Sequence, residues 1–295
     1  ERLRLRLSQF LLGQGFAVES IGVLQVAAQH RPELVKEPRF LLLRGAAQLL
    51  AGRVGPAVDD LQKARAAEPA HETGLWVAAA QTAAGEFADS AALASLPLAT
   101  AIVPSYPAPP RGPLAVLLAE AAVVAGREDE AQRLMTVAKQ TATGGAAQSR
   151  LAYLEGRRRE SRGEIDEAIA AYEEAARLDP RRGRAQAQLA LTQLRLRQGR
   201  ISAAEAAAVL EGLRHAWRGD ALEFQVLREL GRLQLETGNY AAGLRTLKLA
   251  VSDYATLPGA AEATQWMAAA FESLFLDGGA DQMSSVAALG LWDEF

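Results

Sequence analysis

The stretch Ser149–Arg182 reads SRLAYLEGRRRESRGEIDEAIAAYEEAARLDPRR and decides the fold. Gly163 divides it into two helical segments, because glycine accepts the left-handed backbone that commonly ends a helix. On the second segment Ala168, Tyr172 and Ala175 recur at spacings of four and three, the period of one helix face. The stretch therefore predicts two helices joined by a tight turn.

Small residues in this stretch predict that the two helices cross closely. Gly156 lies midway along the first segment and Ala168 lies early in the second, so we expect contact between them. We expect Tyr172 and Ala175 to face the next helix pair. Pro180 is expected to close the unit, because proline cannot continue a helix.

Glycines at the same position between helical segments recur along the whole chain. Glycines expected between paired helices follow one another at intervals of 33 to 41 residues, at Gly15, Gly52, Gly85, Gly126, Gly163, Gly199, Gly238 and Gly278. The small and apolar positions around them match well in five units. The units at Gly85, Gly199 and Gly278 are indicated mainly by spacing.

This pattern resembles the tetratricopeptide repeat (TPR) family, whose period is about 34 residues. The resemblance covers nearly the whole chain and implies an all-α fold, a right-handed α-solenoid of about eight degenerate TPR-like helix pairs. A helical bundle with chance glycines is the alternative, but a bundle requires no such period.

A proline-rich stretch, residues 96–113, interrupts this rhythm with six prolines. Because proline lacks a backbone donor, we expect an extended linker or packed loop there. Pro113 is expected to open the following helix. The predicted organisation is a sub-stack at 1–95, the linker at 96–113 and a second sub-stack at 114–295. A ligand motif for an adaptor domain is the less favoured interpretation.

Composition and motifs argue against catalysis. The chain has no cysteine, which excludes disulfides and thiolate sites, and its three histidines (His30, His71 and His215) lie far apart. We find no phosphate-binding loop and no nucleophile motif, so we predict no enzyme, no metal and no cofactor. The net charge of −3 gives no bulk attraction to nucleic acid. We expect Arg157-Arg158-Arg159 to be a solvated face.

Source and location are indicated only indirectly. Only four of the 32 basic residues are lysine, which is typical of a GC-rich bacterial genome. The chain begins with Glu1 and reads as a segment of a longer protein. The absence of cysteine slightly favours a periplasmic or envelope location over the cytoplasm. The longest apolar stretch, Leu114–Gly126, is too short to insert into a membrane.

The resemblance to TPR proteins implies a partner-binding surface, because the first helices of each pair line a concave groove in that family. Carrying the repeat register across gives seven candidate residues, here called the candidate row: Arg150, Tyr153, Arg157, Gln193, Arg197, Arg228 and Arg232. Arginine forks favour carboxylates, so the hypothesis is an acidic partner segment.

In the N-terminal half the corresponding positions are apolar: Leu42, Ala46, Leu49, Leu75 and Val116. They predict either a groove for an amphipathic helix or ordinary packing positions, and the sequence leaves both open.

The function predicted from these observations is a non-catalytic scaffold or adaptor that binds another protein. By analogy we place it in a larger bacterial protein of an envelope, secretion or motility assembly. The alternative is a substrate-positioning or sensor region of a larger enzyme or transcriptional regulator. The partner's identity and the oligomeric state are left open by the sequence.

Overall fold

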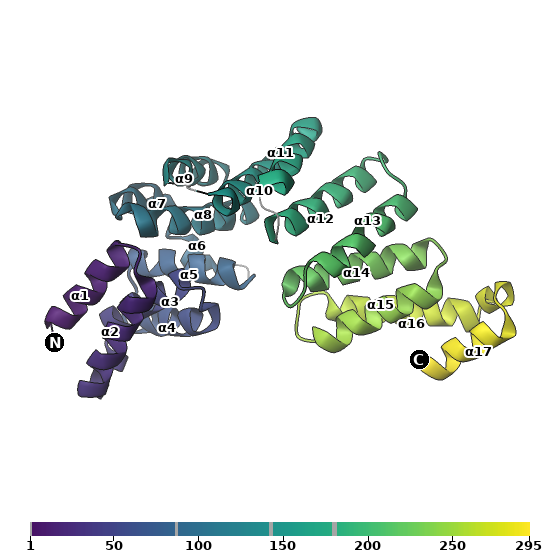
Figure 1. Ribbon diagram of the computed structural model, residues 1–295, viewed down its shortest axis with the longest axis horizontal. Coiled ribbons are helices and arrows are strands. Elements are labelled where there is room, and N and C mark those ends of the chain that lie inside the picture. Colours follow the sequence, from purple (N-terminus) through teal and green to yellow (C-terminus); the bar gives the residue numbers. More distant parts are fainter. Residues whose placement is uncertain (1, 86–87, 142–143, 179–181) are drawn as a thin grey trace. The chain divides into compact units, whose positions relative to one another are not determined.

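The computed structural model describes residues 2–85, 88–141, 144–178 and 182–295 (Figure 1). All regular secondary structure in these ranges is helical, which confirms the predicted all-α repeat. The chain divides into two compact units, Glu1–Leu178 and Asp179–Phe295.

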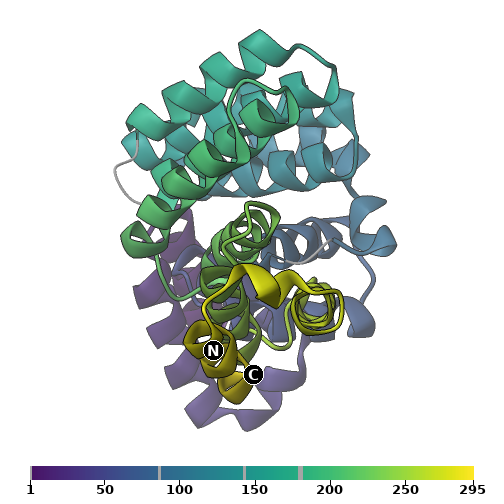
Figure 2. The same ribbon diagram turned by 90° about the vertical axis from the view of Figure 1, so that its right-hand side faces the viewer.

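The described residues of the first unit form five helix pairs, and the second helix of the third pair is broken. Its helices are α1 (Arg2–Gly13), α2 (Ala17–His30), η1 (Pro32–Lys36), α3 (Pro38–Leu50), α4 (Val54–Ala67), α5 (His71–Ala84), α6 (Ser90–Leu93), α7 (Leu96–Ile102), η2 (Val103–Ser105), α8 (Ala108–Val124), α9 (Glu128–Thr141), α10 (Gly145–Ser161) and α11 (Ile165–Leu178). Helices α8 to α11 lie as neighbouring rods in both views (Figure 1, Figure 2).

In the second unit, first and second helices of successive pairs again follow one another along the chain. Its helices are α12 (Arg182–Arg197), α13 (Ala203–Ala216), α14 (Ala221–Glu236), α15 (Tyr240–Asp253), α16 (Ala260–Phe275), η3 (Gly279–Gln282) and α17 (Ser285–Glu294). Helix α12 packs on α13, and α14 packs on both α13 and α15.

The eight glycines predicted to separate paired helices all have left-handed backbone, with φ between 65° and 88°. At Gly163, for example, φ is 74° and the amide donates to the Glu160 carbonyl at 3.0 Å. A residue with a Cβ is strained in this conformation. The predicted turns are therefore confirmed at all eight positions.

Within a pair, a small residue of the first helix receives a large side chain sixteen positions later. A Cβ on Gly156 would come within 2.5 Å of Tyr172 Cε1, and a Cβ on Gly45 or Gly231 would come within 2.6 Å of Leu61 or Leu247 Cγ. The close crossing was predicted correctly. The expectation that Tyr172 faces the next pair was wrong, because its ring fills the space above Gly156 in its own pair.

The proline-rich stretch is helical rather than extended. Helix α7 occupies 96–102, and α8 starts at Ala108, so Pro113 lies inside α8 instead of opening it. Pro97, Pro104 and Pro109 stand at the first or second positions of their helices, where an amide donor has no partner within the helix. The linker predicted at 96–113 is thus corrected, and the observed division falls after Leu178. Pro180 lies outside the described residues.

Two of the weakly matching units depart from the common register for visible reasons. Helix α13 starts later after Gly199 than other second helices do, because Ser202 and Glu205 form a capping box at its first turn. The second helix after Gly85 is replaced by α6 and α7. The first turn of α6 is capped by Asp89, whose carboxylate accepts a hydrogen bond from the Ala92 amide at 2.8 Å.

Candidate functional site

The repeat register places members of the candidate row at equivalent positions of different first helices. Arg157, Gln193 and Arg232 each stand six residues before a turn glycine. Arg157 lies on α10 in the first unit, whereas Gln193 lies on α12 and Arg232 on α14 in the second. The row therefore consists of two groups, one in each unit.

On α10 an aromatic pair supports the exposed arginine. The rings of Tyr153 and Tyr172 lie 5.7 Å apart, and Tyr172 Oη donates to Glu160 Oε2 at 2.6 Å. Burial, followed by the bond to Glu160, raises the pKa of the Tyr172 phenol. Arg157 Nη1 lies 3.4 Å from Tyr153 Oη, and Arg157 is exposed. Arg157 is thus the accessible member here, and Tyr153 is part of the core.

Arg150 is held by a carboxylate of the preceding first helix. Its Nε donates to Glu120 Oε2 on α8 at 2.9 Å, and its Nη2 contacts the same oxygen. Both side chains are partly buried. An acidic partner would have to compete with Glu120 for this arginine.

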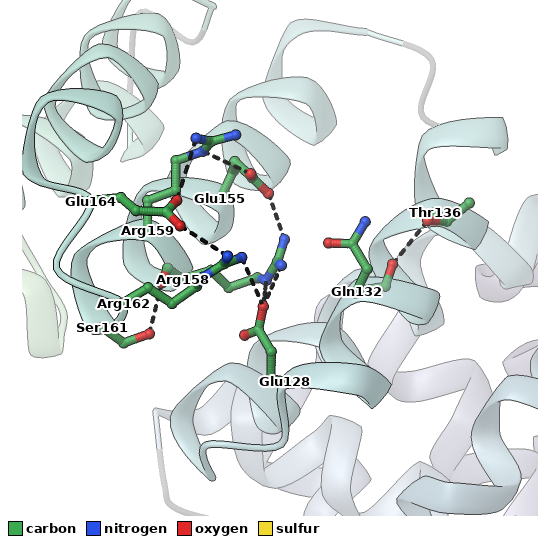
Figure 3. A network of polar contacts seen from close by, with 9 residues as sticks. All are labelled: Glu128, Gln132, Thr136, Glu155, Arg158, Arg159, Ser161, Arg162 and Glu164. Carbon is green, nitrogen blue, oxygen red and sulfur yellow. Dashed lines mark hydrogen bonds and ion pairs between the residues drawn. The ribbon is translucent and has the colours of Figure 1, made fainter.

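The sequence predicted that Arg157-Arg158-Arg159 on α10 form a solvated face. This prediction was wrong for Arg158, which is buried. The Arg158 side chain is only 7% exposed, and it binds Glu128 on α9 and Glu155 on its own helix (Figure 3). The Arg158 Nε to Glu128 Oε1 distance is 3.0 Å, and the Nη1 to Glu155 Oε2 distance is 2.8 Å. This hydrogen bond from Arg158 holds the pKa of Glu128 below its ordinary value.

Two further arginines extend this network toward α11 (Figure 3). Arg159 Nε donates to Glu155 at 2.9 Å, and Arg162 Nη2 lies 2.9 Å from Glu164. Of these ion pairs, those with Glu128 join α9 to the end of α10, whereas the Arg159–Glu155 pair lies within α10 and the Arg162–Glu164 pair lies in the turn before α11.

In the second unit the arginines of α14 are also paired. Arg228 Nη1 lies 3.3 Å from Glu262 Oε2, and its guanidinium stands 5.9 Å from the ring centre of Trp266 on α16. Its Nε is buried and has no hydrogen-bond partner among the described residues. Arg232 binds Glu229 at 2.7 Å and Glu236 at 2.8 Å. Local carboxylates therefore offset the basic character expected of this part of the row.

The two candidates on α12 are more open. Gln193 is half-buried and Arg197, in the last turn, is exposed. The partner-binding role of all seven residues stays a prediction.

The apolar positions of the N-terminal half are packing positions. Ala46, Leu49, Leu75 and Val116 are buried, and Leu42 is half-buried. Of the two interpretations the sequence left open, the structure favours packing, because buried side chains offer no surface to an incoming helix.

A polar cluster that the sequence did not reveal joins α5 to the proline-rich stretch. Trp76 Nε1 donates to Tyr106 Oη at 3.0 Å, and this hydroxyl donates to Glu72. Burial, then the bond to Glu72, raises the pKa of Tyr106. No local motif could indicate this contact, because Tyr106 is about thirty residues from both partners in the sequence.

The described residues contain no feature typical of a metal centre or of a membrane crossing. No cluster of three or more histidine, aspartate or glutamate side chains there could hold a metal ion. No described helix combines the length and apolarity that a membrane crossing requires. His30 ends α2, where its Nδ1 lies 2.8 Å from the Val26 carbonyl oxygen, so this histidine serves at a helix end.

No protein-family profile and no curated protein matches the sequence. The fold, however, is similar to solved structures. A tetratricopeptide repeat protein from Parabacteroides merdae superposes with a TM-score of 0.56 at 14% identity, covering 91% of this chain and 98% of that one. A chain of the APC/C hetero-tetramer Cut9-Hcn1 gives 0.54 at 13% identity, covering 89% of this chain and 48% of that chain.

Yeast Tom70 is a third similar structure, with a TM-score of 0.51 at 13% identity and coverage of 86% of this chain and 58% of Tom70. The chain thus spans about half the length of the two larger proteins. At these identities the likeness concerns the fold alone. The turn glycines, the helix pairs and these superpositions together show that the chain has the tetratricopeptide-repeat fold.

Proposed function

We propose that this chain is a non-catalytic scaffold that binds acidic segments of a partner protein, through arginines on first helices in each of its two units. The observation that carries the proposal is the repetition of arginine in register. Arg157 and Arg232 occupy the same position, six residues before the turn glycine, in two different first helices. Repeat proteins commonly recognise partners through such equivalent positions.

The contacts that Arg157 and Arg232 make within the chain determine how strongly a partner carboxylate can bind them. Arg232 is bound by Glu229 and Glu236, whereas Arg157 is exposed and lies at the edge of a tyrosine pair. A partner carboxylate would exchange with these internal carboxylates. The expected binding is therefore moderate in strength and weakens as salt screens it.

The proposal is tested by capturing partners on the immobilised chain and comparing charge reversals. Arg157→Glu and Arg232→Glu should each reduce the captured partner at least about tenfold, because a like charge replaces an attractive contact. Arg133→Glu is the matched control, since Arg133 is an exposed arginine on the second helix α9. Equal capture by all variants would contradict the first-helix surface.

A natural host for such a scaffold is a larger bacterial assembly in the envelope, in secretion or in motility. What supports this placement is the arginine-rich, cysteine-free composition. Fractionating cells of the source organism and locating the chain by antibody would test it, and a wholly cytoplasmic protein would contradict it.

A further inference from the structure

Helix α2 carries an uncharged row of residues on an accessible face, here called the α2 row: Val18, Gly22 and Val26. They follow one another at spacings of four, so they lie on one side of the helix. Val18 is 58% exposed and Val26 is 42% exposed. Between the two valines Gly22 has no side chain, so another helix can approach the backbone closely there.

The corresponding face of other second helices is exposed too, but it is charged. The α2 row stands three, seven and eleven residues after the turn glycine Gly15. Counted in the same way from the turn glycines before α4, α9 and α11, two of the three positions are charged and exposed: Asp59 and Lys63, Asp129 and Arg133, and Asp166 and Glu174. Because α4 and α9 lie between other helix pairs of the chain, exposure of this face is a property of second helices in this fold. Helix α2 differs from them in having no charge in the row.

Nothing in the described part of the chain requires a glycine at position 22. Gly22 is not among the glycines with left-handed backbone, and no atom from another part of the described chain lies within 4 Å of a Cβ built on it. A glycine inside a helix costs about 1 kcal/mol relative to alanine. Close approach of a second surface is a reason to keep a glycine at such a position.

The residues on either side of Gly22 are complementary to one another. Glu19 stands three residues before Gly22 and Gln25 three residues after it, just as the two valines stand four before and four after. Glu19 and Gln25 are exposed, and neither forms a hydrogen bond or ion pair with a residue that the structure describes. A two-fold axis at Gly22 would place valine against valine and the Glu19 carboxylate beside an amide that can donate to it. The face is therefore complementary to itself.

We propose that α2 packs antiparallel on α2 of a second copy, about a two-fold axis at Gly22. Val18 contacts Val26 of the second copy, and Glu19 accepts a hydrogen bond from Gln25 of the second copy, each twice by symmetry. A contact between two identical surfaces closes at two copies. Two short helix faces bury less than about 1,000 Å², so the dimer is weak and depends on protein concentration. It uses none of the first-helix arginines of the proposed function, so either proposal can fail without the other.

Sedimentation velocity from about 1 to 500 µM tests this association over the range expected for a small interface. The average mass of the wild type should rise with concentration toward that of a dimer. Gly22→Glu should retain folding, because a Cβ there is in open space. It should shift the rise to at least about tenfold higher concentration, since two like charges meet at the axis. Ala170→Glu is the matched control, at the equivalent exposed position of α11, and should associate like the wild type.

Disulfide trapping tests the antiparallel direction, because the chain has no cysteine of its own. Positions 18 and 26 lie about 12 Å apart along the helix. In the antiparallel pair, position 18 of one copy lies near position 26 of the other and far from the other position 18. A disulfide requires Cα atoms within about 7 Å, so a mixture of Val18→Cys and Val26→Cys should crosslink at least about tenfold faster than either variant alone.

Three results would overturn the proposal. The first is a wild type that stays monomeric over the whole concentration range, including one whose α2 binds a different protein instead. The second is a Gly22→Glu variant that associates like the wild type. The third is crosslinking of Val18→Cys alone as fast as the mixture, because the two copies would then not be antiparallel.

Discussion

The ring of Tyr172 lies directly on Gly156, so closely that a single methyl group at Gly156 would come within 2.5 Å of the ring. This contact fixes the distance between α10 and α11. Tyr172 is also bound through its hydroxyl to Glu160, one turn further along α10. One packing contact and one hydrogen bond of Tyr172 therefore fix how α11 crosses α10.

Gly156→Ala should destabilise the chain by about 1–3 kcal/mol, because overpacking outweighs the roughly 1 kcal/mol gained from alanine's helix propensity. Urea unfolding at equilibrium measures the difference. Gly212→Ala is the control, since nothing lies within 4 Å of a Cβ at this helical glycine. It should be neutral or stabilising by up to about 1 kcal/mol. Equal loss of stability in both variants would contradict the close-contact account.

Glu128→Gln should weaken the seam between α9 and α10 at neutral pH. Its carboxylate binds the buried Arg158, and this bond lowers the pKa of Glu128 below 4.5. A lowered pKa contributes stability that is present above 4.5 and is lost as the pH falls through the folded-state pKa. The difference from wild type should therefore be clear at pH 7 and fade toward pH 3.

The size of this effect is limited because Glu128 is partly exposed, so we expect about 1 kcal/mol or less from the pair. Urea titrations at pH 7 and pH 3 measure it. Asp129→Asn is the matched control, because Asp129 is exposed in the same first turn of α9. A pH-independent difference for Glu128→Gln, or an equal change for Asp129→Asn, would show that Arg158 is not the cause.

Asp89→Asn should loosen α6 from α4 and α5. The carboxylate receives two bonds from Arg65, at 2.7 and 2.8 Å, and one from Gln81 at 3.1 Å, and it caps α6 through Ala92. The bond from Arg65 is the largest cause that lowers the pKa of Asp89. We expect a loss of about 1–2 kcal/mol, typical of a cap combined with a bidentate arginine.

Hydrogen exchange followed by mass spectrometry should show faster exchange confined to α6 and α7 in Asp89→Asn. Asp59→Asn, an exposed aspartate on α4, should leave exchange there unchanged. Uniformly faster exchange throughout the first unit would mean that Asp89 supports the whole fold rather than this element.

The turns of this fold are readable from sequence because left-handed backbone is a local property of glycine. Gly163 and its seven counterparts could be identified from their spacing and, in five units, from the small and apolar residues around them. The helix that Tyr172 contacts could not be predicted, because a second helix has neighbours in its own pair and in the next pair. The sequence does not show which of them a side chain on that face contacts. The prolines of residues 96–113 predict a break, because the sequence does not show that Pro97, Pro104 and Pro109 stand in first turns, where proline is tolerated.

The helices that carry the candidate residues could be predicted, but the ion pairs that these residues form could not. The register located Arg150, Arg228 and Arg232 on first helices, as observed. Their partners could not be inferred, because Glu120 and Glu262 lie 30 and 34 residues away in the sequence. Arg158 illustrates the same limit, since only the packing of α9 on α10 brings Glu128 to it.

The most direct test of the proposed scaffold is site-specific photocrosslinking in the presence of captured partner. A photoreactive amino acid replaces Arg157 or Gln193 on first helices, and Arg133 or Leu249 on second helices, all of which are at least partly exposed. The account predicts partner crosslinks from 157 and 193, mapped to an acidic segment, and none from 133 or 249. Crosslinks from the second-helix positions alone would contradict it.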